Sequence, residues 1–191
     1  MKFTSIFTTA LLAANVIASP LASPEPHQLS KRDAPAVVAA VKVLSDDMVA
    51  LNVTLNSYEG GLGSAITALK IKAQTDTVKK ATEAVTEAAD ASAKFTNKGA
   101  GEVANSLLAL QPNINSVLDN IVSKKGAFEE ALLGFISLTW LVKSDLEDLK
   151  DLSADLGEAV IKKLTPQYAA LAPVLNKQIA KKFAEAIKAY E

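Results

Sequence analysis

The sequence predicts an all-α protein, an antiparallel bundle of about five long helices, some of them kinked, with space for a central hydrophobic cavity. Three observations predict this class. Apolar residues recur at steps of three and four along most of the chain after residue 33, which is helical spacing. No stretch alternates apolar and polar residues as a half-buried strand does, so we expect no sheet. The 191-residue chain has no cysteine, so packing has to stabilise it without disulfides.

The first 18 residues have the pattern of a secretory signal peptide. Lys2 supplies the positive start, residues 3–17 form the apolar region, and Ala18 ends a small-residue cleavage site. The alternative, a membrane anchor, is disfavoured because the apolar run is shorter than the roughly 20 residues that span a bilayer and because prolines follow it. We therefore expect a secreted protein.

Residues 19–32 have the composition of a propeptide. They are rich in proline and serine, lack apolar periodicity and close on Lys31-Arg32, a dibasic pair that resembles a Kex2-type processing site. Cleavage there leaves a single domain, residues 33–191. The removed part holds three of the 20 basic residues and one of the 21 acidic ones, so the net charge of the mature chain is 17 minus 20, or −3.

The composition of the mature chain argues against several classes of function. The only histidine and the only arginine, His27 and Arg32, precede residue 33, and there is no cysteine. The usual general base and thiol nucleophile are therefore absent, and we predict no catalytic residue and no enzyme. We also predict no cofactor and no metal site. An acidic chain without arginine disfavours nucleic acid as a partner, and no segment after residue 32 is expected to span a membrane.

Two helices are predicted before residue 95. The first begins near Pro35 and ends at Gly60-Gly61, and it contains a glycosylation sequon at Asn52, whose exposure the pattern leaves open. The second covers residues 62–94, and the weak helix formers at 74–77 indicate a bend or interruption. We call the residues that repeat at helical spacing, and so share one face of a helix, its stripe. The predicted stripes are Val37, Val41, Leu44, Met48, Leu51, Leu55 and Tyr58 for the first helix, and Leu62, Ile66, Leu69, Ala73, Val78, Ala81, Val85, Ala88, Ser92 and Phe95 for the second.

A turn over residues 96–101 precedes the predicted third helix. Pro112 lies in its interior, where the missing N–H predicts a kink near Leu108. Two lysines and a glycine at 124–126 are a typical helix end. The stripe of this helix is Val103, Leu107, Leu110, Ile114, Val117 and Ile121.

Residues 131–142 form the most apolar run of the mature chain and contain its only tryptophan, Trp140. A helix that is apolar on nearly every side has to be surrounded by other elements. We therefore expect residues 127–150 to form a central helix, with Trp140 in the core. The stripe here is Phe128, Leu132, Phe135, Thr139, Val142, Leu146 and Leu149.

The remaining residues predict a continuation and a last helix. The central helix extends to about residue 163, with Gly157 as a site where it could break. Thr165-Pro166 begins the last helix as N-cap and first-turn proline. Its stripe is Leu171, Leu175, Ile179, Phe183, Ala186 and Tyr190.

Several stretches together resemble a known fungal family. These are Asn52–Gly61, which closes the first helix, Leu107–Pro112, and Ile121–Lys125 ahead of Phe128. They are similar to the hydrophobic surface-binding protein A and cell wall galactomannoprotein family. The resemblance implies an all-helical domain that binds fatty acids or related lipids in a cavity, or adsorbs to hydrophobic surfaces and helps to recruit secreted hydrolases. Some members are antigens of the cell wall. The chain lacks their Ser/Thr-rich stalk and GPI signal, which favours free secretion over attachment to the wall.

Three irregularities predict a tunnel inside the bundle: the alanine-rich residues 81–93, Pro112 and Gly134. We expect a long-chain lipid to lie between the third and central helices, with Thr139 as the partner of a polar headgroup. The alternative, a surface-active protein whose helices open onto an apolar surface, stays open because it needs the same stripes. The expected apolar walls are Val103, Leu107, Leu110 and Ile114 on one side, and Phe135, Leu138 and Val142 on the other.

Overall fold

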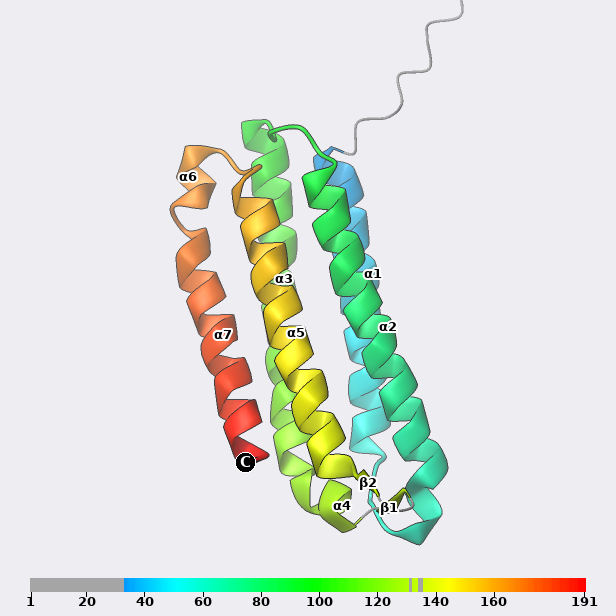
Figure 1. Ribbon diagram of the computed structural model, residues 1–191. Helices are drawn as coiled ribbons and strands as arrows, with labels where there is room; N and C mark the ends of the chain where they lie inside the picture. The colour runs from blue at the N-terminus through cyan, green and yellow to red at the C-terminus, as the bar shows by residue number, and fades with distance from the viewer. Residues whose placement is uncertain (1–32, 131, 134–135) are drawn as a thin grey trace, which may run out of the picture.

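The computed structural model describes residues 33–130, 132–133 and 136–191, so the predicted signal peptide and propeptide lie outside the described residues. The predicted all-α bundle of five long helices is confirmed (Figure 1). The long helices are α1 (Ala34–Asn56), α2 (Ala65–Asp90), α3 (Asn97–Ser123), α5 (Leu138–Ile161) and α7 (Ala172–Ala189). The short elements are the 3-10 helix η1 (Leu62–Ser64), α4 (Lys125–Glu130), β1 (Leu132–Leu133), β2 (Ile136–Ser137) and α6 (Pro166–Ala169).

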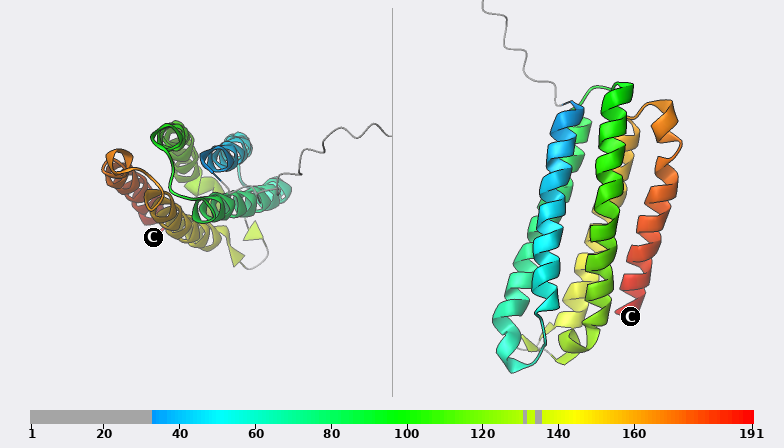
Figure 2. Two further views of the ribbon diagram at one scale, coloured as in Figure 1. Left: turned by 90° about the horizontal axis from the view of Figure 1, so that it is seen from above. Right: turned by 180° about the vertical axis from the view of Figure 1, so that it is seen from behind.

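The five long helices form a closed ring. Helix α1 packs against α2 and α3, α2 also packs against α5, and α7 joins α5 to α3, as the end-on view in Figure 2 shows. Successive long helices run in opposite directions, so the ring neighbours α1 and α3, α2 and α5, and α3 and α7 are parallel pairs. At a given distance between helices, a ring of five encloses more space than a ring of four. Side chains therefore have a wide centre to fill.

The two ends of the ring differ in what covers them. The short helix α6 lies at one end, which we call the α6 end. The strands β1 and β2 and helix α4 lie at the other, which we call the hairpin end (Figure 1). Helix α1 runs from the α6 end to the hairpin end, where Gly60 turns the chain with φ at +78°. A Cβ at Gly60 would come within 2.6 Å of the Ala127 carbonyl oxygen, so this turn needs glycine.

Neutral side chains join the parallel pair α1 and α3. The Asn113 amide donates to the Ser45 hydroxyl at 2.8 Å, and the Asn52 amide donates to the Ser116 hydroxyl at 2.9 Å. The Asn120 amide donates in turn to the Asn52 amide oxygen at 3.0 Å. We call these contacts the amide seam. They fix the register of two helices that are separated in the sequence by the whole of α2.

Charged side chains join a second parallel pair, α2 and α5. The Lys79 ammonium lies 2.6 Å from a carboxylate oxygen of Asp145 and 2.6 Å from one of Asp148. Lys72 pairs with Asp76 on its own helix and lies 3.5 Å from Asp145. Burial lowers the pKa of Lys79, but hydrogen bonds to the two carboxylates outweigh it and raise the pKa above its ordinary value. Lys79 therefore stays charged and holds α2 against α5.

The predicted stripe of α1 is confirmed, but that of α2 is correct only in its second half. Helix α2 continues without interruption through residues 74–77. The predicted core residue Ile66 is 82% exposed, and Leu69 and Ala73 are exposed too. The residues that face inward are instead those at helical spacing before Val78. They are Thr75, Ile71 and Ala68, and all of them are buried. The buried Thr75 hydroxyl donates to the Ile71 carbonyl at 2.9 Å, which lets a polar residue occupy this face.

Helix α3 begins earlier than predicted. Thr96 is its N-cap and accepts a hydrogen bond from the Gly99 amide at 3.1 Å, so most of the predicted turn 96–101 is helical. The helix includes Pro112 as a single element and ends at Ser123, before the predicted stop.

The predicted central helix 127–150 is wrong. After α4 the chain forms a two-residue antiparallel ladder, in which Leu132 pairs with Ser137, and α5 begins only at Leu138. The small ladder also corrects the expectation of no sheet. The chain has to reverse direction between α3 and α5, so the described strands β1 and β2 of this apolar run lie at the end of the bundle. Helix α5 is one member of the ring with a solvent face, and Trp140 lies on that face, 66% exposed, not in the core.

The last part of the chain departs from prediction in one place. Helix α5 continues through Gly157 to Ile161 without a break. The predicted last helix is divided into α6 and α7, because Pro173 in the first turn of α7 starts a new helix. Thr165 precedes α6 but its side chain makes no capping hydrogen bond. Within the described ranges, none of the helices combines the length and the apolar character that crossing a membrane requires.

Candidate binding cavity

A largely apolar cavity of about 290 Å³ lies inside the ring at the α6 end. Its volume is at the lower limit of the roughly 300–1,000 Å³ that is typical of small-molecule sites. Helices α1, α3, α5 and α7 form most of its walls, α2 contributes Thr82, and α6 and the connection before it close one side. We call it the main cavity. It is lined by Leu44, Met48, Thr82, Ala104, Asn105, Leu107, Leu108, Leu110, Ile114, Ser153, Leu156, Gly157, Val160, Ile161, Leu164, Tyr168, Leu171, Ala172, Leu175, Asn176 and Ile179.

Small residues keep this part of the ring open. Ala104 of α3, Gly157 of α5 and Ala172 of α7 all line the cavity and offer little bulk. A Cβ at Gly157 would overlap the side-chain amide of Asn176, so glycine is what allows this amide to sit against α5. The small side chains of Ala104 and Ala172 leave the centre of the ring unfilled at this level.

The cavity opens to solvent beside the junction of α6 and α7. Leu108 and Leu171 line the cavity and are also 53% and 66% exposed, so they lie at its mouth. Val174, on the first turn of α7, is exposed as well. An apolar ligand therefore meets apolar side chains outside the cavity before it enters.

The polar groups of the main cavity are neutral. No charged residue is among those that line it, all of which belong to the described part of the chain. Asn105, Ser153, Tyr168 and Asn176 supply amide and hydroxyl groups. Among the described residues, none makes a hydrogen bond with the Asn176 amide, so its N–H groups are available to an acceptor. The arrangement suits a ligand with a long apolar part and one acceptor group.

A second, smaller cavity of about 40 Å³ lies at the hairpin end. Leu51 of α1 and Leu149 of α5 lie at its inner limit, and Lys72 and Asp145 are its charged members. We call it the minor cavity. The full lining is Leu51, Leu55, Ala68, Ile71, Lys72, Thr75, Ile121, Phe128, Leu138, Leu141, Val142, Asp145, Leu146 and Leu149.

The structure separates the predicted site residues into groups. Leu107, Leu110 and Ile114 line the main cavity as one wall, whereas Leu138 and Val142 line the minor cavity. The remaining three fall elsewhere. Val103 is fully buried in the core beside the main cavity, Thr139 lines neither cavity, and Phe135 lies outside the described residues.

The predicted walls of the tunnel need correction. Of the alanine-rich segment 81–93, only Thr82 reaches the main cavity, and Pro112 lines a surface groove instead. Gly134 lies outside the described residues. The wall opposite α3 comes from the second half of α5 and from α7, and not from the predicted residues Leu138 and Val142. Leu175 and Ile179 are half-buried because they face the cavity, and no pattern in the sequence separates that position from a filled core.

The sequon at Asn52 lies in the amide seam. Its side chain is half-buried and is engaged with Ser116 and Asn120 across the α1–α3 interface. A glycan on the Asn52 nitrogen would take one of its two N–H positions and crowd the contact with Ser116. Glycosylation at this position therefore remains a prediction that conflicts with one contact of the folded protein.

A comparison with protein families matches residues 34–162 to the family described as hydrophobic surface binding protein A. No curated protein matches the chain in sequence. Among solved structures, AFMP4P in complex with palmitic acid is similar, with a TM-score of 0.77 and 25% identity over 83% of this chain and 100% of that one.

Two domains of the Penicillium marneffei MP1 protein share the fold. Ligand-binding domain 2, complexed with multiple arachidonic acids, has a TM-score of 0.73 and 21% identity over 84% of this chain and 97% of its own. Ligand-binding domain 1, complexed with arachidonic acids, has a TM-score of 0.71 and 19% identity over 80% and 95%.

Proposed function

Since the chain belongs to the hydrophobic surface binding protein A family, we propose that it binds the hydrocarbon chain of a long-chain fatty acid in the main cavity and catalyses no reaction. The observation that carries this proposal is the main cavity itself. All five long helices contribute to its lining, which is mostly aliphatic, and none of its lining residues is charged. Such a site favours an apolar chain over a polar metabolite.

Similar proteins support the choice of ligand. AFMP4P, which is 25% identical and aligns over its whole length, is complexed with palmitic acid. Both MP1 domains are complexed with arachidonic acids. We extend this ligand class to the present chain because its own cavity is apolar and opens at Leu108 and Leu171.

Binding energy in this proposal comes mainly from the alkyl chain. Burying about fourteen methylenes at about 0.8 kcal/mol each contributes on the order of 11 kcal/mol. Association costs at least about 4 kcal/mol of translational and rotational freedom, so micromolar affinity is expected. The carboxylate accepts from the amide of Asn176 or from the Tyr168 hydroxyl at the α6 end, where the lining offers neutral donors. Thr139, our sequence-based choice, is not close to this site.

A tryptophan in the main cavity tests the proposal. Leu110 is buried and lines the cavity, so Leu110→Trp fills the space that the chain would occupy. We expect palmitate binding, measured by isothermal titration calorimetry, to weaken at least tenfold. Val122→Trp is the matched control, because Val122 is on the same helix, is partly exposed and lines neither cavity. Equal palmitate affinity in wild type, Leu110→Trp and Val122→Trp, with all three folded by circular dichroism, would refute the main cavity as the binding site.

A second candidate function is adsorption to hydrophobic surfaces. The observation that favours it is a set of exposed apolar residues toward the hairpin end, Ile66, Leu69 and Trp140. Replacing Ile66 and Trp140 by serine should reduce retention of the protein on octadecyl-coated silica. Val43→Ser, at another exposed apolar position on α1, is the control. Retention that is equal in all three proteins would remove these residues from any adsorption surface.

We also propose that the protein is secreted and that the mature chain begins at Asp33. Ala34, the first residue of α1, is buried close to Gly99 of α3, so cleavage after Arg32 leaves the whole helical fold intact. Amino-terminal sequencing of secreted protein should give Asp33. A start at Ser19 would mean that the dibasic site is not used.

A further inference from the structure

The main and minor cavities lie end to end along the axis of the ring. On α1, Leu44 and Met48 line the main cavity, whereas Leu51 lines the minor one. On α5, Leu149 belongs to the minor cavity and Ser153 to the main one. No lining residue is shared. At a rise of 1.5 Å per residue, the step from Met48 to Leu51 is about 4.5 Å, so little more than one layer of side chains separates the two spaces.

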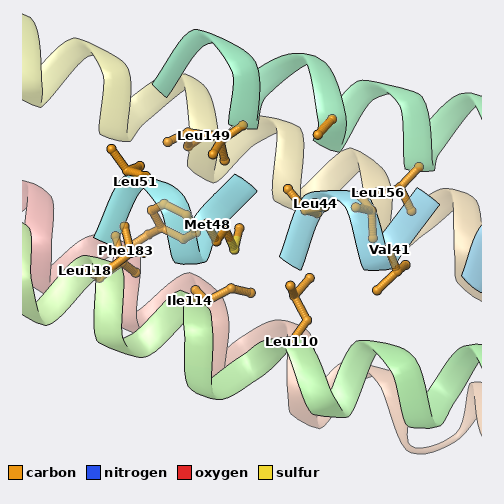
Figure 3. Packing of buried hydrophobic residues seen from close by; sticks show 14 of the residues in the cluster. Val41, Leu44, Met48, Leu51, Leu110, Ile114, Leu118, Leu149, Leu156 and Phe183 are labelled. Carbon is orange, nitrogen blue, oxygen red and sulfur yellow. The ribbon is translucent and has the colours of Figure 1, made fainter. Parts of the chain in front are cut away.

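Met48 and Phe183 are in that layer. Figure 3 shows Met48 between Leu51 on one side and Leu44 on the other, with Phe183 next to Met48 on the Leu51 side. Phe183 of α7 is buried and lines neither cavity, and Leu118 of α3 is buried in the same way. Met48 is the member of the layer that faces the main cavity. We call Met48, Leu118 and Phe183 the partition.

Met48 differs from its neighbours in flexibility. Its side chain is unbranched and has three rotatable bonds, so it adapts to irregular space more easily than leucine or phenylalanine. The Met48 side chain also borders the empty main cavity, so it has space in which to rotate. Leu118 and Phe183 are held by close packing in the core.

We propose that Met48 determines the length of hydrocarbon chain that the protein accepts. A fatty acid enters at the α6 end with its methyl terminus toward the partition. A chain that fills only the main cavity leaves Met48 in place. A longer chain displaces Met48 and passes into the minor cavity, so that the two spaces become one tunnel. This inference rests on the proposed function, because it assumes that the main cavity takes an alkyl chain.

The proposal predicts how affinity depends on chain length. Each methylene that enters the main cavity should tighten binding about fourfold. The gain should stop at the length that reaches Met48, because displacing this side chain offsets the next methylenes. The dissociation constants of saturated fatty acids with 10 to 20 carbons should therefore show a plateau in the wild-type protein.

Met48→Ala tests the partition directly. Truncation removes the obstacle and should raise the affinity for the 20-carbon acid, relative to the 12-carbon acid, at least tenfold over the wild-type ratio. Leu44→Ala is the matched control. It enlarges the main cavity from the same helix without touching the partition, so the ratio should stay within about twofold of wild type.

Met48→Leu is the second variant, and it keeps the side-chain volume if Met48→Ala does not fold. The branched, stiffer leucine should keep the partition closed and lower the same ratio at least threefold. The role of Met48 would be overturned if the ratio of 20-carbon to 12-carbon affinity stayed at the wild-type value in every Met48 variant that folds. It would also be overturned if Leu44→Ala changed this ratio as much as the Met48 variants do. If wild-type protein binds none of the acids, the proposed function itself fails, and that outcome is distinct.

Discussion

The two ends of one helical ring are filled differently, although the same five helices form both. At the hairpin end, Tyr58 stacks on Phe128 with ring centroids 4.6 Å apart, and Tyr190 lies 6.5 Å from Phe128. The cavity left there measures about 40 Å³. At the α6 end, the small residues Ala104 and Gly157 line the cavity, which measures about 290 Å³. The difference shows that side-chain size, and not the helix arrangement, decides whether this ring is solid or hollow.

The filled end also satisfies the hydroxyl of one of its buried tyrosines within the protein. The Tyr190 hydroxyl donates to the Ile121 carbonyl at 2.7 Å. Burial raises the pKa of Tyr190 well above its ordinary value, with a smaller contribution from Glu129. The hollow end instead leaves the Asn176 amide without a hydrogen bond to any described residue. The filled end is therefore expected to supply stability, and the hollow end to bind the ligand.

Removing an aromatic ring from the filled end should have the largest effect. Phe128→Ala deletes the side chain that contacts both tyrosines and leaves a cavity, which should lower the free energy of unfolding by about 3–5 kcal/mol. Urea denaturation measures this loss. A loss below about 1 kcal/mol would mean that the hairpin end is not the more tightly packed one.

Removing one hydroxyl from the same end should have a smaller effect that depends on pH. Tyr190→Phe should lower the free energy of unfolding by about 1 kcal/mol at neutral pH, because the Ile121 carbonyl keeps a hydrogen bond from the Lys124 amide.

The pKa of Tyr190 is higher in the folded than in the unfolded state, so its contribution to stability is present below pH 10 and is lost as the pH rises above that value. Wild-type stability should therefore fall more steeply above pH 10 than that of Tyr190→Phe. Parallel pH profiles would contradict this assignment.

Filling the hollow end should change stability less and binding more. Ala104→Leu adds apolar volume inside the main cavity and should raise the free energy of unfolding by about 0.5–1 kcal/mol while weakening palmitate binding at least tenfold. Ala109→Leu, on the exposed face of the same helix, is the control and should change neither. A destabilised Ala104→Leu with normal binding would show that this space is already occupied by the packing of the protein.

The smallest effect is expected at the largest apolar side chain of the hairpin end. Trp140 is 66% exposed, so Trp140→Ala should change the free energy of unfolding by less than about 0.5 kcal/mol. A loss comparable to that of Phe128→Ala would place Trp140 in the core after all.

The sequence predicted what depends on periodicity within one helix. The α1 stripe from Val37 to Tyr58 is buried throughout, because its apolar residues keep one spacing along the whole helix and so share a single face. In α2, Ile66 and Leu69 compete with Ala68 and Ile71, and spacing alone does not decide which pair faces inward. The run around Trp140 is apolar enough for a core, but its composition does not reveal that the chain reverses there.

The cavity was predicted from one wall only. Leu107, Leu110 and Ile114 share a face of α3, which the spacing reveals. The opposite wall depends on which helices are neighbours in the ring, and helical periodicity carries no information about that order. Leu175 and Ile179 of α7 have the spacing of core residues and become a cavity wall only because small residues face them.

The amide seam has a consequence for how the chain folds. Its hydrogen bonds join residues 64 or 68 positions apart, and the bonds of Lys79 to α5 join residues 66 or 69 apart. Helical proteins usually fold fast because most of their contacts are local, whereas this ring depends on distant ones. During synthesis, α1 has only α2 as a partner until α3 emerges, and the ring closes only when α7, the last helix, docks on α5 and α3. Because α7 supplies one wall, the main cavity cannot be complete before α7 docks, so we expect removal of residues 172–191 to abolish it.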